Sequence, residues 1–107
     1  AYTLLLRDDG SIINDATVWQ LAEDRYLVFS GRLGDLQHAA ALACGLELDI
    51  ADRSRMQSVI AIQGQASWAV IQRCFADSVP ALPARLPYYG FAPVAFRGAA
   101  CLLARIG

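Results

Sequence analysis

An aspartate inside an apolar segment is the first residue of this chain that could do chemistry. Asp15 lies in the run 12–21, which is rich in the β-favouring residues Ile, Thr, Val and Trp. A carboxylate in such a segment must find water or a partner, because its desolvation is costly. In general, a carboxylate can accept a proton or stabilise a nearby positive charge. Asp15 could equally be a strand-edge aspartate that is exposed to water or bonded to a turn amide.

The cysteines and the histidine are weaker candidates. Cys44, Cys74 and Cys101 are widely spaced among alanines and leucines, without a spacing typical of zinc sites. We expect buried thiols in a reducing compartment and no metal site, since cysteine is one of the most buried residue types. His38, the single histidine, begins an alanine-rich stretch, so we expect it at a helix surface or boundary.

Length, composition and charge limit the classes of protein. The 107 residues suffice for one small domain with one core, and the hydrophobic content of 56% is high. Nine basic residues, all arginine, nearly cancel ten acidic ones, so there is no basic field for nucleic acid or an anionic membrane. Apolar runs fall far short of the roughly 20 residues of a transmembrane helix. We expect a cytoplasmic protein with no membrane or nucleic-acid partner.

The first third of the chain predicts three antiparallel strands. Residues 3–7 form a short extended run, and the turn residues 8–11 lead into a second strand over 12–21. A turn at 23–24 then introduces a third strand over 26–29. These strands should carry and position Asp15.

The hydrophobic period changes after residue 34. Asp35 could cap a helix of about ten residues, which would end at Gly45 in a left-handed conformation. Residues 46–50 alternate as a half-buried strand does, and the apolar run 59–62 predicts a central strand. A polar connection, 52–55, separates these two predicted strands.

A second helix and two more strands complete the predicted order. Apolar spacing favours a helix over 66–75, prolines then indicate a loop that includes 81–90, and strands over 92–96 and 100–104 are joined by a turn at 97–98. The order βββ-α-ββ-α-ββ predicts an α+β fold, a mainly antiparallel sheet with two helices on one face.

Three segments resemble landmarks of the folate-dependent aminomethyltransferase superfamily, whose type member is the glycine cleavage T-protein. They are residues 9–18, Asp-Gly-Ser-Ile-Ile-Asn-Asp-Ala-Thr-Val, residues 58–66, Ser-Val-Ile-Ala-Ile-Gln-Gly-Gln-Ala, and residues 103–107, Leu-Ala-Arg-Ile-Gly. The last resembles the strand that runs into the family's Gly-Tyr-Thr-Gly-Glu motif. The resemblance implies a ferredoxin-like folate-binding T-protein domain, of which residues 1–107 would be the central segment.

The resemblance also implies roles for individual residues. In the family the first landmark carries two consecutive acids, one of which approaches the reactive nitrogens of tetrahydrofolate. Here Asn14 replaces the first acid, so the retained Asp15 takes the catalytic role and a contact with the cofactor. Tyr89 would form an aromatic wall on the folate side, or pack in the core beneath its loop. Arg105 would bind the cofactor, form an ion pair or hold a sheet edge.

The chain departs from the family pattern at two places. Residues 28–32, Val-Phe-Ser-Gly-Arg, lack the asparagine that contacts the pterin in the family. Gln65 stands where the second landmark usually has a helix-initiating proline, which the first helical position prefers without requiring. Gly64 would let the chain turn sharply from strand to helix.

The function implied by the resemblance is aminomethyl transfer, in which a one-carbon unit passes from an amine to tetrahydrofolate, as in glycine cleavage. Its partners would be folate and a small amine or an aminomethyl-carrier protein. The alternatives are the folate domain of a sarcosine or dimethylglycine oxidoreductase, and a non-enzymatic relative in folate binding or iron-sulfur assembly. Because the chain would supply only part of a pocket, we expect it to be inactive alone. We also expect it to self-associate, because its hydrophobic content is high and its net charge is close to zero.

Overall fold

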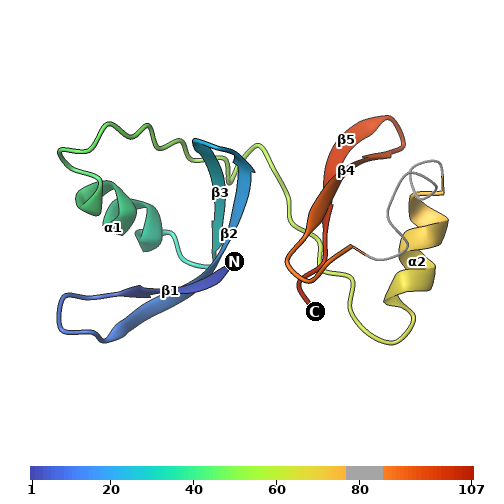
Figure 1. Cartoon of the computed structure of the whole chain (residues 1–107), viewed down its shortest axis with the longest axis horizontal. Coiled ribbons are helices and arrows are strands. Elements are labelled where there is room, and N and C mark those ends of the chain that lie inside the picture. The colour runs from blue at the N-terminus through green and yellow to red at the C-terminus, as the bar shows by residue number, and fades with distance from the viewer. Residues whose placement is uncertain (77–85) are drawn as a thin grey trace. The chain divides into compact units, whose positions relative to one another are not determined.

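A computed structural model describes residues 1–76 and 86–107 (Figure 1). The chain forms two compact units, 1–58 and 59–107. Among the described residues the elements are two helices and antiparallel strands, which confirms the α+β class. The strands form a three-stranded sheet in the first unit and a two-stranded sheet in the second.

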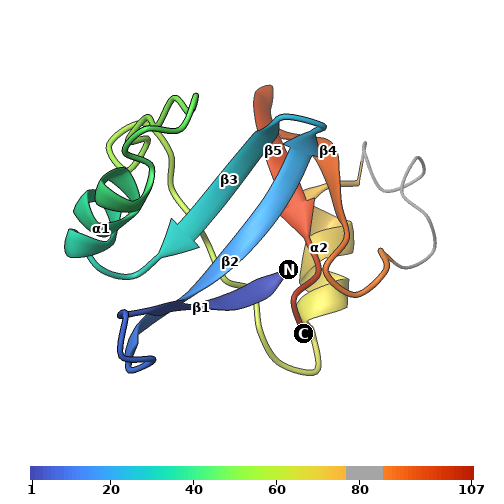
Figure 2. The ribbon, with the colours of Figure 1, turned by 60° about the vertical axis from the view of Figure 1, so that its left-hand side comes forward.

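The first unit is built on an antiparallel meander (Figure 2). Its strands are β1 (Tyr2–Leu6), β2 (Ile12–Ala22) and β3 (Arg25–Ser30), in the order β1-β2-β3. The predicted turn between β1 and β2 is confirmed. Oδ1 of Asp9 accepts the N–H of Ser11 at 2.9 Å, and Gly10 has a φ of 83°, a backbone conformation that favours glycine.

The pairing of β1 with β2 contains a β-bulge. Leu5 lies opposite Asn14 and Leu6 lies opposite Ile12, so Ile13 is the extra residue on β2. Beyond the bulge the register is regular, and Ala16 of β2 is 3% exposed. Just before the centre of β2, the pairing between β2 and β1 is therefore irregular.

Helix α1 spans Gly34–Leu42 and ends as predicted, with Gly45 at a φ of 83°. Its beginning differs from the prediction. Leu33 is the N-cap residue, and no side chain caps the helix. Asp35 lies inside the first turn instead, where its carboxylate accepts a hydrogen bond from Asn14 of β2.

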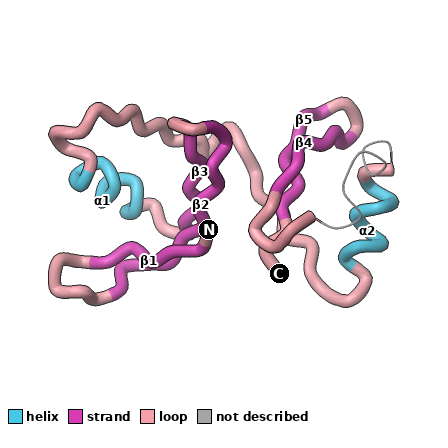
Figure 3. Tube along the Cα trace, viewed as in Figure 1, coloured by secondary structure: helices cyan, strands magenta, loops and turns pink. Residues whose placement is uncertain are grey.

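The strands predicted over 46–50 and 59–62 are wrong. Residues 46–63 form turns and extended loop without a ladder (Figure 3). Their apolar side chains are exposed, with Leu48 at 62% and Ile60 at 83%. A strand requires a neighbour for its N–H and C=O groups as well as an apolar pattern, and no described residue pairs with these segments.

The second unit contains helix α2 and a hairpin. Its elements are α2 (Ser67–Cys74), β4 (Phe91–Phe96) and β5 (Ala99–Ala104). The predicted hairpin turn is confirmed, since Arg97 and Gly98 both have positive φ values, of 49° and 82°. The rings of Phe75 and Phe96, 5.6 Å apart, join the end of α2 to β4. Gly64, at a φ of 107°, precedes α2 and turns the chain into it.

Candidate functional site

Asp15 lies in the middle of β2, opposite Leu4 of β1, and its side chain is exposed. Oδ2 of Asp15 accepts a hydrogen bond of 3.1 Å from the hydroxyl of Tyr2. This hydrogen bond raises the pKa of Tyr2 above its ordinary value of 10.0, and desolvation and the charge of Asp15 act in the same direction. The first unit thus presents an accessible carboxylate with one oxygen engaged by a neutral donor.

Aromatic side chains share the face of Asp15. Alternation along β2 puts Asp15, Thr17 and Trp19 on one side of the sheet. There the rings of Trp19 and Phe29 lie 4.7 Å apart at an angle of 58°. Tyr2 of the same face is 55% exposed. This surface offers carboxylate lone pairs to N–H groups and apolar rings to a flat ligand.

Asn14 projects to the opposite face of β2, toward α1. Its Nδ2 donates a hydrogen bond of 2.7 Å to Oδ2 of Asp35, a residue that is only 4% exposed. This bond is the main cause that holds the pKa of Asp35 below its ordinary value, with smaller contributions from a Ser30 hydrogen bond and the charges of Arg32 and His38. Desolvation opposes the shift. Asn14 and Asp35 therefore form an amide–carboxylate pair.

Sequence reasoning missed this pair. Asp35 follows Gly34 at a change of period, which indicates a helix start and suggests a cap, while its partner lies 21 residues earlier in the chain. The alternation of side chains along the strand contains a weak signal for this pair. Because alternate residues of a strand face opposite ways, Asn14 and Asp15 cannot share one environment, and a polar Asn14 needs its own partner.

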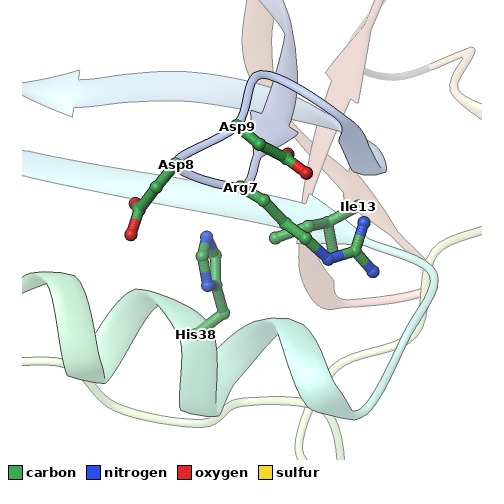
Figure 4. Close-up of a pocket in the computed structure, with 5 residues that line it drawn as sticks. All are labelled: Arg7, Asp8, Asp9, Ile13 and His38. Carbon is green, nitrogen blue, oxygen red and sulfur yellow. The ribbon is translucent and has the colours of Figure 1, made fainter.

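An open cavity of about 450 Å³ lies beside the turn between β1 and β2. Figure 4 shows His38 projecting from α1 toward this turn, which carries Asp8 and Asp9, with Arg7 and Ile13 on one side. Nε2 of His38 is buried and has no hydrogen-bond partner among the described residues. The cavity offers charges of both signs and could admit a small polar molecule.

Tyr89 and Arg105, the two predicted site residues of the second unit, lie together. The N–H of Tyr89 donates to the carbonyl oxygen of Arg105 at 2.8 Å, and the N–H of Arg105 donates to that of Gly90 at 2.9 Å. Nη1 of Arg105 donates to the carbonyl oxygen of Leu86 at 3.2 Å. The ring of Tyr89 lies 4.3 Å from that of Tyr88 and is partly exposed. Arg105 thus holds the turn that presents the two tyrosines.

The predicted loop over 81–90 falls partly on residues outside the described ranges. Within residues 1–76 and 86–107, no group of His, Cys, Asp and Glu side chains could hold a metal ion, and Cys44, Cys74 and Cys101 are free thiols. Contrary to the expectation of buried thiols, Cys44 and Cys74 are exposed and Cys101 is only partly buried. Cys44 follows α1 and Cys74 ends α2, so neither faces a core. No helix in the described part of the chain has the length and apolar character to cross a membrane.

Comparison with known proteins gives consistent matches. The chain matches the GCVT N-terminal domain family over residues 1–107. It is 30% identical to an aminomethyltransferase of Chlorobaculum parvum over 110 residues, covering 99% of this chain and 29% of the relative. It is 29% identical to an aminomethyltransferase of Streptomyces coelicolor over 109 residues, covering 99% of this chain and 28% of the relative.

The similarity extends to a thermophile. An aminomethyltransferase of Thermus thermophilus is 30% identical over 74 residues, covering 66% of this chain and 21% of the relative. The chain thus spans less than a third of the length of these relatives. No solved structure gives a significant match.

Proposed function

Because this chain belongs to the glycine cleavage T-protein family, through its GCVT N-terminal domain, we propose that it is the central segment of a tetrahydrofolate-dependent aminomethyltransferase. The enzyme would work in the cytoplasm, with folate and a small amine or an aminomethyl-carrier protein as partners. The similarity to aminomethyltransferases supports this proposal, and none of the described residues favours the oxidoreductase or iron-sulfur alternatives.

The observation that carries the proposal is the exposed carboxylate of Asp15. Its Oδ2 atom is held by the Tyr2 hydroxyl at 3.1 Å, which leaves Oδ1 and the remaining lone pairs for a ligand. Folate supplies the amine nitrogens that receive the one-carbon unit. An ionised carboxylate fits these nitrogens, because it accepts hydrogen bonds from N–H groups and attracts positive charge.

Asp15 would act on the reaction in two ways. It would accept the proton that the folate nitrogen loses when this nitrogen bonds to the one-carbon unit, while the bond from that carbon to the donor nitrogen breaks and the donor leaves as a free amine. It would also stabilise the positive charge that develops at the transferring carbon. The Tyr2 hydroxyl would restrict rotation of the carboxylate and so keep the same oxygen facing the ligand.

The family resemblance further suggests Tyr89 and Arg105 as contacts of the cofactor. The partly exposed ring of Tyr89 suits stacking against a flat heterocycle. Arg105 already uses Nη1 to hold the carbonyl oxygen of Leu86, so its effect on folate would come mainly through the position of Tyr89.

The direct test of the function uses the full-length protein of which we propose this chain to be a part. That protein is incubated with tetrahydrofolate and an aminomethyl-loaded carrier protein, and transfer of the one-carbon unit to folate is followed by mass spectrometry. We expect transfer that requires both components. If the folded protein binds neither folate nor the carrier and transfers nothing, the proposed function is wrong.

A further inference from the structure

Two side chains from the segment after β3 hold β2 at the residues just before Asp15. Nη1 of Arg32 donates to the backbone carbonyl oxygen of Ile13 at 2.8 Å. Oδ2 of Asp35 accepts from Nδ2 of Asn14 at 2.7 Å. Both contacts fall on the bulge, where Ile13 is the extra residue of β2. These two hydrogen bonds therefore hold β2 at the place where its pairing with β1 is irregular.

The position of the Asp15 side chain depends on the register of β2 at these two contacts. A slip of one residue in a strand pairing moves each side chain to the other face, and a bulge is the place where such a slip can be absorbed. Asp15 follows the bulge directly, and its hydrogen bond to Tyr2 depends on the observed register. Holding Asn14 on the α1 side keeps Asp15 on the opposite side, next to Tyr2.

We infer that Asp35 is a positioning residue for Asp15, because its buried carboxylate holds Asn14 and thereby fixes the register that turns Asp15 toward Tyr2. With only 4% of its surface exposed, Asp35 acts through β2 rather than on a ligand. The catalytic meaning of Asp15 rests on the function proposed above, whereas the positioning effect can be measured without folate or turnover.

The same contact explains why residue 14 is an asparagine in this chain. The amide of Asn14 can donate a hydrogen bond to the carboxylate of Asp35, which a carboxylate at residue 14 could not do. Two carboxylates at this separation repel each other, so one of them would have to take up a proton or move away. Exchanging the residues, with Asn14→Asp and Asp35→Asn together, restores one donor and one acceptor without changing the net charge.

The phenol of Tyr2 reports the position of Asp15, because the hydrogen bond to Asp15 raises the pKa of Tyr2. The chain is labelled with isotopic tyrosine and titrated by NMR, and the Tyr2 signal is assigned from a Tyr2→Phe variant. Asp15→Asn defines the Tyr2 pKa without the ionised partner. Asp49→Asn, at an exposed position outside the helices and strands, controls for the loss of one charge.

We expect Asp35→Ala to lower the Tyr2 pKa to the value found in Asp15→Asn, while Asp49→Asn leaves it raised. The exchanged pair should return the Tyr2 pKa to the wild-type value. A folded Asp35→Ala variant with an unchanged Tyr2 pKa would overturn the inference. If Asp35→Ala does not fold, the exchanged pair decides, and a lowered Tyr2 pKa or an unfolded chain in that variant overturns the inference equally.

Discussion

Replacing Gly90 with alanine tests the turn that presents Tyr89. A Cβ atom at Gly90 would lie 2.6 Å from Cγ, 2.8 Å from Cδ and 2.9 Å from the carbonyl oxygen of Pro87. Cβ contacts essentially never fall below 3.0 Å, and neither a proline ring nor a backbone carbonyl can move aside alone. The turn must open, which breaks the 2.7 Å hydrogen bond from the Gly90 N–H to the Pro87 carbonyl oxygen.

The two costs set the size of the effect. Overpacking costs about 1–3 kcal/mol and a backbone hydrogen bond contributes about 0.5–1.5 kcal/mol, so Gly90→Ala should lower the free energy of unfolding of the second unit by about 1.5–4.5 kcal/mol. Urea unfolding is followed by the fluorescence of Trp68, which lies in α2, in a Trp19→Phe background.

Gly107→Ala is the matched control for this experiment. A Cβ atom at Gly107 meets nothing within 4 Å, so the unfolding midpoint of that variant should match that of the Trp19→Phe parent. A Gly90→Ala variant with the same midpoint as the Gly107→Ala control would refute the close approach of Gly90 to Pro87, and with it the rigid presentation of Tyr89.

Three further predictions follow from the described residues. First, the lowered pKa of Asp35 means that its contribution to stability is complete above its ordinary pKa of 3.8 and is lost as the pH falls through the lower folded value. Acid unfolding followed by Trp19 fluorescence in a Trp68→Phe background should therefore be less steep in Asp35→Asn, and equal steepness would contradict this role. Second, the isolated chain should bind tetrahydrofolate very weakly, because under the proposed function it would supply only part of the folate pocket; a dissociation constant of about 1 μM by calorimetry would contradict this expectation. Third, the exposed apolar side chains of 46–63, including Ile60 at 83%, should make the isolated chain self-associate, whereas sedimentation as a monomer at high concentration would refute this expectation.

Local patterns in the sequence predicted the hairpin turns, the end of α1, and most of the helices and strands. The turn residues Asp9 and Gly10 define the first hairpin, Gly45 ends α1, and Arg97 with Gly98 makes the last hairpin turn. In each case a few neighbouring residues determine the backbone conformation, because the hydrogen bonds are local or the φ angle favours glycine. The hydrophobic period of the sequence also predicted the three strands of the first sheet and both helices.

Features that depend on distant partners could not be predicted. The apolar run 59–62 has the composition of a central strand, but composition does not show which strand would pair with it. Asp35 looked like a helix cap because its local sequence fits one, whereas its partner Asn14 lies on another element. The proposal of Asp15 as a site residue came from a resemblance to a family, and the structure adds its contact with Tyr2.

The role of Asp15 is tested most directly by turnover of the full-length enzyme with Asp15→Asn, compared with Asp49→Asn as a control for charge. Loss of the carboxylate removes a proton acceptor and the stabilisation of positive charge, so kcat for aminomethyl transfer should fall by roughly 100-fold or more while the unfolding midpoint stays the same. The Asp49→Asn variant should keep the wild-type kcat. A correctly folded Asp15→Asn enzyme with wild-type kcat would show that Asp15 is only an exposed strand residue bonded to Tyr2.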